Sequence, residues 1–121
     1  MKQIKKYLLG FAALMLMATA SAQENIENSI DSMTVARQGG VVNVKLTFKK
    51  PLTTLPPGFS IAKPARIALD FANTTNALGK NSQSYNEGDL KSVNVVQAEG
   101  RTRLVMNLNR AMTYESTIDG N

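Results

Sequence analysis

The chain contains an internal repeat, in which residues 32–53 align without a gap with residues 92–113 at an offset of 60. In each copy an apolar segment, a turn with glycine and a second apolar segment follow in the same order. Apolar and polar residues alternate in these segments, and a period of two is typical of a β-strand with one buried face. The aligned apolar and glycine positions are Met33 and Val93, Val35 and Val95, Gly40 and Gly100, Val44 and Leu104, Leu46 and Met106, Phe48 and Leu108, and Leu52 and Met112.

The repeat predicts an all-β domain of two layers. Because the apolar face lies at the same distance from the turn in both copies, two hairpins can pack face to face about a pseudo-twofold axis. A chance likeness between two amphipathic hairpins is the alternative to a true duplication, since few aligned positions are identical. The identical positions are Ser32 and Ser92, Val35 and Val95, Gly40 and Gly100, and Thr53 and Thr113.

Period and turn residues together predict six strands. These cover residues 30–37, 41–49, 59–72, 92–98, 102–109 and 113–119. Pro64 falls inside the third strand and predicts a bulge or an edge position there, because proline cannot donate to a ladder. Residues 73–91, rich in Asn, Ser and Gly, are predicted to connect the sheets. The predicted core residues are Val44, Leu46, Phe48, Ile67, Leu69, Phe71, Val95, Leu104, Met106 and Leu108.

The N-terminus matches a secretory signal peptide. Three lysines precede the apolar run 7–17, and small residues end at Ala22. The run is shorter than the roughly 20 residues that span a bilayer, so cleavage after Ala22 is favoured over a membrane anchor. The predicted organisation is a signal peptide over residues 1–22, a flexible leader over residues 23–29 and one β domain over residues 30–121.

The charge balance and the lack of cysteine narrow the setting and the partners. The signal peptide holds three of the fourteen basic residues and none of the nine acidic ones, so the remainder has a net charge of +2. This weak excess does not indicate nucleic acid as a partner. A small exported domain without cysteine has no disulfide framework, which suits a bacterial periplasm.

The composition also excludes several classes of chemistry. With no histidine and no cysteine, the chain lacks catalytic triads, thiol nucleophiles and zinc sites built on imidazole or thiolate. A carboxylate pair would still need a cleft around a glycosidic bond, for which a thin two-layer domain has little volume. We therefore predict no enzymatic activity, no catalytic or metal-binding residue and no cofactor. The carboxylates considered are Asp70, Glu87, Asp89, Glu99, Glu115 and Asp119.

Five polar residues on or directly beside the predicted strands are the candidate ligand-binding residues. Guanidinium groups on an outer sheet face can hold carboxylates and amide carbonyls of a polymeric ligand. The commoner arrangement is a solvated face on which Asp70 pairs across strands with Arg66 or Arg103, and the sequence leaves both interpretations open. The candidates are Arg66, Asp70, Arg101, Arg103 and Asn107.

Several strings in these segments resemble the AMIN domain, a small β module of bacterial envelope proteins. They are PARIALDF at 64–71, SVNVVQ at 92–97 and TRLVMNL at 102–108. Three more specific strings resemble the N-terminal AMIN domain of type IV pilus secretins, namely NSIDSM at 28–33, PGFS at 57–60 and NEGDL at 86–90. The likeness runs from about Asn28 to Asn121.

This resemblance implies a fold and a role. The implied fold is a small sandwich of two three-stranded sheets with internal symmetry. The implied role is to hold an envelope machine at the cell wall, with peptidoglycan and pilus assembly proteins as partners, in the periplasm or at the outer membrane. The ring-forming and pore-forming segments of a secretin are not expected within residues 1–121, so membrane association would come only through the rest of a secretin.

Two other functions fit the same features. One is the targeting module of a cell-wall amidase, whose catalytic domain would follow. The other is a protein-interaction module that binds a pilus assembly partner by strand addition at an exposed edge.

Overall fold

The computed structural model describes residues 27–121, which form eight β-strands and no helix. The strands are β1 (Asn28–Gln38), β2 (Val41–Phe48), β3 (Gly58–Ala62), β4 (Ala65–Ala72), β5 (Thr74–Asn76), β6 (Ser82–Glu87), β7 (Leu90–Ala98) and β8 (Arg101–Leu108). The predicted all-β class is confirmed. No helix within this range could cross a membrane. The predicted signal peptide and most of the predicted leader lie outside the described residues.

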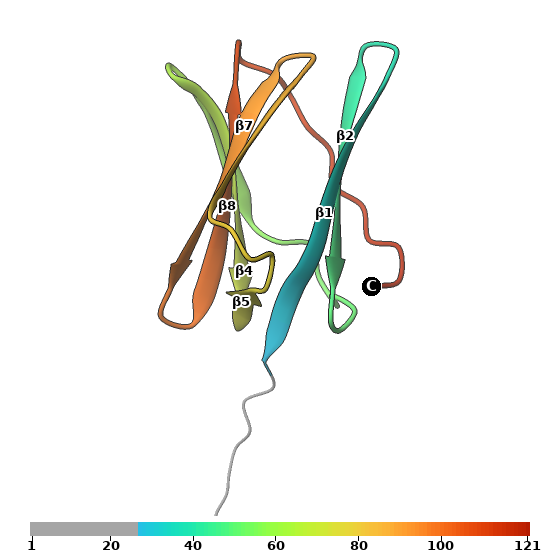
Figure 1. Cartoon of the computed structure of the whole chain (residues 1–121), viewed down its shortest axis with the longest axis vertical. Helices are drawn as coiled ribbons and strands as arrows, with labels where there is room; N and C mark the ends of the chain where they lie inside the picture. The colour runs from blue at the N-terminus through green and yellow to red at the C-terminus, as the bar shows by residue number, and fades with distance from the viewer. Residues whose placement is uncertain (1–26) are drawn as a thin grey trace, which may run out of the picture.

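The strands form two sheets that lie as two layers (Figure 1). In the three-stranded sheet, with order β2-β1-β5, β1 runs antiparallel to β2 and parallel to β5. The other sheet has five antiparallel strands in the order β3-β4-β8-β7-β6. The predicted pair of three-stranded sheets is therefore wrong for the second sheet, which gains two edge strands.

One of these edge strands arises because the predicted strand over 59–72 is a hairpin. The chain turns at Lys63 and Pro64, and Ala62 then pairs with Ala65. Proline lacks the amide donor that a continuing ladder needs, so a turn leaves fewer unsatisfied backbone groups than a straight strand would. The segment before Pro64 thus becomes β3, at the edge of the sheet.

The predicted connection over residues 73–91 also contains two strands. The short β5 pairs with the start of β1, and β6 pairs with β7 and closes the other edge of the five-stranded sheet. Its polar sequence gave no strand signal, because strand β6 buries no continuous apolar face. Such polar segments form strands because their backbone N–H and C=O groups pair with those of a neighbouring strand.

The two repeated hairpins have the same strand register. Val35 pairs with Val44 in the β1–β2 hairpin, and Val95 pairs with Leu104 in the β7–β8 hairpin. Val95 lies 60 residues after Val35, and Leu104 lies 60 residues after Val44. The sequence alignment therefore corresponds to an equivalence of backbone pairing.

Both hairpins also carry a β-bulge at the equivalent place. The register of β1 with β2 shifts just before Ser32, and that of β7 with β8 shifts just before Ser92. The extra residues are Asp31 and Lys91, which lack a cross-strand partner in their hairpins. A bulge resets which side chains face each side of the sheet, so it redirects the residues next to it.

The core lies between the layers. The rings of Phe48 on β2 and Phe71 on β4 have centroids 5.2 Å apart with an interplanar angle of 49°. Seven predicted core residues are buried, namely Phe48, Ile67, Leu69, Phe71, Val95, Leu104 and Met106. The other three, Val44, Leu46 and Leu108, are partly buried against this cluster. The core cluster also contains three residues that the predicted core did not include, namely Ile30, Leu90 and Val93.

The layers are open along β2, where a groove of about 720 Å³ is lined by apolar side chains of both sheets. The C-terminal residues 109–121 cross from the end of β8 to the β1–β2 layer (Figure 1). Met112, Tyr114 and Ile118 line the groove. The strand predicted at 113–119 is wrong, because this segment spans the gap between layers instead of running along an edge. Its last residue is tied to β2, where the Phe48 N–H donates to the Asn121 carbonyl at 3.0 Å.

Candidate functional site

All five candidate residues lie on β4 and β8, on the outer face of the five-stranded sheet. On β4 the buried residues Ile67, Leu69 and Phe71 face the core, so Arg66 and Asp70 face outward. Their partners on β8 share this side, with Asn107 opposite Arg66 and Arg103 opposite Asp70. Arg101 follows at the end of β8, two residues from Arg103. The structure thus divides the candidates between two ends of one sheet face.

At one end Asp70 is bound by arginine. The Arg103 Nε donates to Asp70 Oδ1 at 2.7 Å, and an Arg103 terminal nitrogen donates to Asp70 Oδ2 at 3.0 Å. Arg101 adds a longer ion pair of 3.7 Å. The hydrogen bonds from Arg103 hold the pKa of the Asp70 carboxyl below its usual range, and the positive charges of Arg103 and Arg101 add to this effect. The cross-strand ion pair predicted as an alternative is therefore present, with Arg103 as the partner.

Arg103 is also covered on its other side. Its guanidinium carbon lies 5.3 Å from the centroid of the Phe59 ring on β3, a distance at which cation and ring attract. Its hydrogen bonds to Asp70 raise the pKa of Arg103. Two of the five N–H donors of Arg103 are used on Asp70, and the contact with Phe59 adds a second neighbour, so its guanidinium is held in place within the fold.

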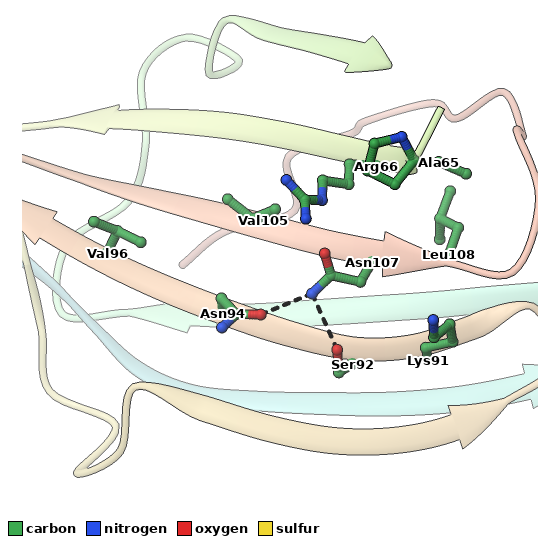
Figure 2. Close-up of a pocket in the computed structure, with 10 residues that line it drawn as sticks. Ala65, Arg66, Lys91, Ser92, Asn94, Val96, Val105, Asn107 and Leu108 are labelled. Atoms are coloured by element: carbon green, nitrogen blue, oxygen red, sulfur yellow. Dashed lines mark hydrogen bonds between the residues drawn. The ribbon is translucent and has the colours of Figure 1, made fainter. Parts of the chain in front are cut away.

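At the other end of the face there is an open hollow of about 490 Å³. Arg66 on β4 and Asn107 on β8 lie opposite each other on its floor, and Figure 2 shows the Arg66 side chain extending over β8. The residues that line it are Pro64, Ala65, Arg66, Lys91, Ser92, Asn94, Val96, Val105, Asn107 and Leu108. Two candidates, Arg66 and Asn107, therefore belong to the hollow, whereas Asp70, Arg101 and Arg103 do not.

The Asn107 amide is held in one orientation. Its Nδ2 donates to Ser92 Oγ at 3.0 Å and to Asn94 Oδ1 at 2.7 Å on β7. Both amide protons are thus used, and the Asn107 Oδ1 makes no hydrogen bond among residues 27–121. Figure 2 shows this oxygen directed toward the Arg66 side chain. The floor of the hollow therefore presents a fixed carbonyl acceptor beside a cation.

Lys91 supplies a second cation that the sequence did not single out. Lys91 lies two residues before the buried Val93 and four before the buried Val95. Strict alternation along the strand would therefore direct its side chain toward the core. The bulge in β7 instead leaves Lys91 exposed beside Ser92 at the rim of the hollow. The sequence indicates the special position of Lys91 only indirectly. In the repeat Lys91 aligns with Asp31, and each of the two residues directly precedes one of the aligned serines.

The hollow carries local positive charge although the net charge of the domain is small. Arg66 and Lys91 are exposed on its two sides, and no acidic residue lines it. Asp70, on the same strand as Arg66, is neutralised by Arg103. Within residues 27–121 no group of three His, Cys, Asp or Glu side chains could hold a metal ion. The arrangement suits an anionic ligand that also offers amide or hydroxyl groups.

The fold and this face define a small all-β module with an open, polar sheet surface. The family model described as the AMIN domain matches residues 29–121. The chain therefore belongs to the AMIN domain family.

Several curated proteins are similar to the chain. The fimbrial assembly protein PilQ of Pseudomonas aeruginosa is 36% identical over 107 residues, which cover 88% of this chain and 15% of that protein. The type IV pilus biogenesis and competence protein PilQ of Neisseria gonorrhoeae is 32% identical over 111 residues, or 92% of this chain and 15% of that protein. The chain thus spans about one seventh of the length of these relatives. No solved structure matches it significantly.

Proposed function

We propose that the chain is a peptidoglycan-binding and positioning module of a type IV pilus secretin, without catalytic activity, that serves pilus assembly. The AMIN family implies the wall ligand, and the names of the PilQ relatives support the setting. The observation that carries the proposal is the cationic hollow on the outer sheet face, where Arg66 and Asn107 present groups that suit wall carboxylates and amides. The pseudo-twofold duplication of the hairpins belongs to this proposal and is supported by their matching registers.

The mechanism is shallow and multivalent. Exposed ion pairs each contribute little, so a single module binds weakly. A ring of secretin subunits would present many copies to one wall layer, and effective concentration then raises the total affinity without any new contact. Arg66 and Asn107 make the direct contacts, while Arg103 and Arg101 hold Asp70 and keep its charge from opposing an anionic ligand.

The test is co-sedimentation of the chain with purified peptidoglycan. We expect a small bound fraction for the monomer and a larger one when the chain is displayed on an oligomeric scaffold. Raising the salt concentration from about 0.05 to about 0.5 M should lower the bound fraction, because the Debye length falls from above about 10 Å to below about 8 Å. Arg66→Ala should weaken binding about three- to fivefold.

Lys45→Ala is the matched control, because Lys45 is an exposed cation on β2 in the other sheet. It removes the same charge and should leave binding unchanged. If the wild-type chain stays in the supernatant even as a multimer, wall binding is wrong.

Strand addition is the second candidate function, and the exposed edge strand β3 favours it. Every residue of β3 is exposed, with Phe59 at 45% and Ile61 at 42% of their full accessibility. An edge of this kind can pair with an extended segment of a pilus assembly partner. Ile61→Lys would disrupt such a contact and spare the hollow, so loss of partner capture with intact sedimentation would support this function. The names of the PilQ relatives favour either pilus function over an amidase module.

A further inference from the structure

We propose that the hollow between Arg66 and Lys91 binds the peptide stems of the cell wall, by their carboxylate and amide groups, and not its glycan strands. The inference rests on the proposed function and specifies which part of the polymer is recognised. It follows from the charge of the hollow, from the orientation of its amides and from the side chains that line it.

The charges of the hollow match the stems. Arg66 and Lys91 stand on opposite sides of a floor that has no acidic lining residue. Stem peptides carry free carboxylates along a short chain, whereas N-acetylglucosamine units of the glycan are neutral. A carboxylate gains charge-assisted hydrogen bonds from either cation, and the arginine fork can hold it in bidentate fashion. The hydroxyl and acetamide oxygens of a neutral sugar can also accept hydrogen bonds from these cations, but they lack the negative charge that adds Coulomb attraction and the paired oxygens that fit the arginine fork.

The polar groups between the two cations match a peptide bond. Asn107 Oδ1 is a fixed acceptor, because both protons on its Nδ2 are donated to Ser92 and Asn94. The Asn94 Nδ2 makes no hydrogen bond among the described residues and is available as a donor. A ligand N–H can therefore bind Asn107 while a ligand carbonyl binds Asn94, which is the donor and acceptor pair of an amide.

The apolar part of the hollow does not suit a sugar ring. Sugar rings are commonly held by their C–H face against an aromatic ring, which offers a large flat apolar surface. The lining residues are aliphatic or polar, and the nearby Phe59 has the Arg103 guanidinium over its ring. The small Ala65 and the branched Val96 and Val105 instead leave space for the side chains of a short peptide.

The bulge itself does not require a cation. The equivalent bulge in β1 places Asp31 where β7 places Lys91. Asp31 accepts a hydrogen bond from Ser29 at 2.6 Å and lies on the other sheet. The bulge position thus holds an acidic residue in one hairpin and a basic residue in the other. We therefore expect Lys91→Asp to keep the fold, which makes it a suitable test variant.

The experiment is a competition assay with a direct titration beside it. A soluble stem tetrapeptide, a neutral oligomer of N-acetylglucosamine and a tetraglutamate peptide are each added to the chain bound to intact peptidoglycan. We expect the stem peptide alone to release the chain. In a separate NMR titration of the free chain, the stem peptide should shift the side-chain amide signals of Asn94 and Asn107. Lys91→Asp should weaken both responses about tenfold, and Lys45→Asp should change neither.

The outcomes separate this inference from the proposed function. Release by the sugar oligomer and not by the stem peptide would overturn the inference while wall binding stands. Equal release by tetraglutamate would also overturn it, since the hollow would then recognise charge alone, as on an acidic protein segment. If the chain does not sediment with peptidoglycan at all, the proposed function fails, and an absent NMR response would overturn the inference independently.

Discussion

Asp70 divides the outer sheet face into two ends with different properties. It accepts two hydrogen bonds from Arg103, which is itself held against Phe59. Arg66 lies opposite Asn107, four residues along β4 from Asp70, and makes no ion pair among residues 27–121. A single acidic residue therefore decides which arginine is paired within the fold and which one has no ion pair among the described residues.

The ion pair makes a prediction about pH. Because the pKa of Asp70 is lowered in the folded state, its contribution to stability is present above the unfolded pKa of about 4 and is lost as the pH falls through the folded value. We expect Asp70→Asn to lower the free energy of unfolding at pH 7, and we expect the difference from wild type to narrow as the pH falls below about 4. Urea unfolding at several pH values measures this difference.

Asp119→Asn is the control for this series, because Asp119 is exposed in the C-terminal segment and forms no ion pair among the described residues. Its free energy of unfolding should follow wild type across the pH range. A deficit in Asp70→Asn that is the same at pH 7 and at low pH would contradict the assigned role of the ion pair.

At the scale of elements, both repeated hairpins contribute to the core, but their aligned residues are buried to different extents. The inner face of β8 is buried at Leu104 and Met106, whereas the aligned β2 residues Val44 and Leu46 are only partly buried. The reason is that β8 lies inside its sheet and β2 lies at an edge beside the open groove. Phe48 from one sheet and Phe71 from the other contact each other between the layers.

Truncation of this aromatic pair should therefore destabilise the fold. Phe48→Ala or Phe71→Ala is expected to lower the free energy of unfolding by about 3 kcal/mol, the lower end for a buried phenylalanine, because the adjoining groove gives the site room to relax. Phe59→Ala is the matched control, since Phe59 is exposed, and should cost at most about 1 kcal/mol. Chemical denaturation measures all three, and equal midpoints for Phe71→Ala and Phe59→Ala would show that the assigned core is wrong.

At the scale of the whole molecule, the apolar groove and the cationic hollow lie on opposite faces of the five-stranded sheet. The C-terminal segment crosses the open side of the layers and ends at β2 (Figure 1). The cationic hollow lies on the far side of the five-stranded sheet from the core, so it remains open whatever covers the groove. A ligand could therefore bind the outer face without disturbing the packing on the inner face.

Export is predicted at this scale as well. We expect the exported chain to begin at Gln23, because three lysines, a short apolar run and small residues ending at Ala22 precede it. Intact mass and N-terminal sequencing of the periplasmic form measure the cleavage point. A form that keeps residues 1–22 and fractionates with membranes would support the anchor instead.

Sequence patterns alone were sufficient to predict the strands of the two hairpins and their buried faces. Alternation is a local property, because successive side chains on any strand point to opposite sides. The offset of 60 residues therefore predicted two similar hairpins, and the structure gives them the same register, with Val35 opposite Val44 and Val95 opposite Leu104. The same alternation predicted that Arg66, Asp70 and Arg103 share one outer face, as they do, whereas the ligand of that face stays a prediction from the family resemblance.

The number of strands, the path of the C-terminal segment and the composition of the hollow follow from contacts that exist only in the folded molecule. Strand β6 carries no apolar signal of its own and forms because β7 offers it backbone partners. Lys91 reaches the hollow because a bulge shifts β7 against β8, and Asn107 is fixed by side chains from another strand. These features depend on hydrogen bonds between residues far apart in the chain, which a local pattern does not encode.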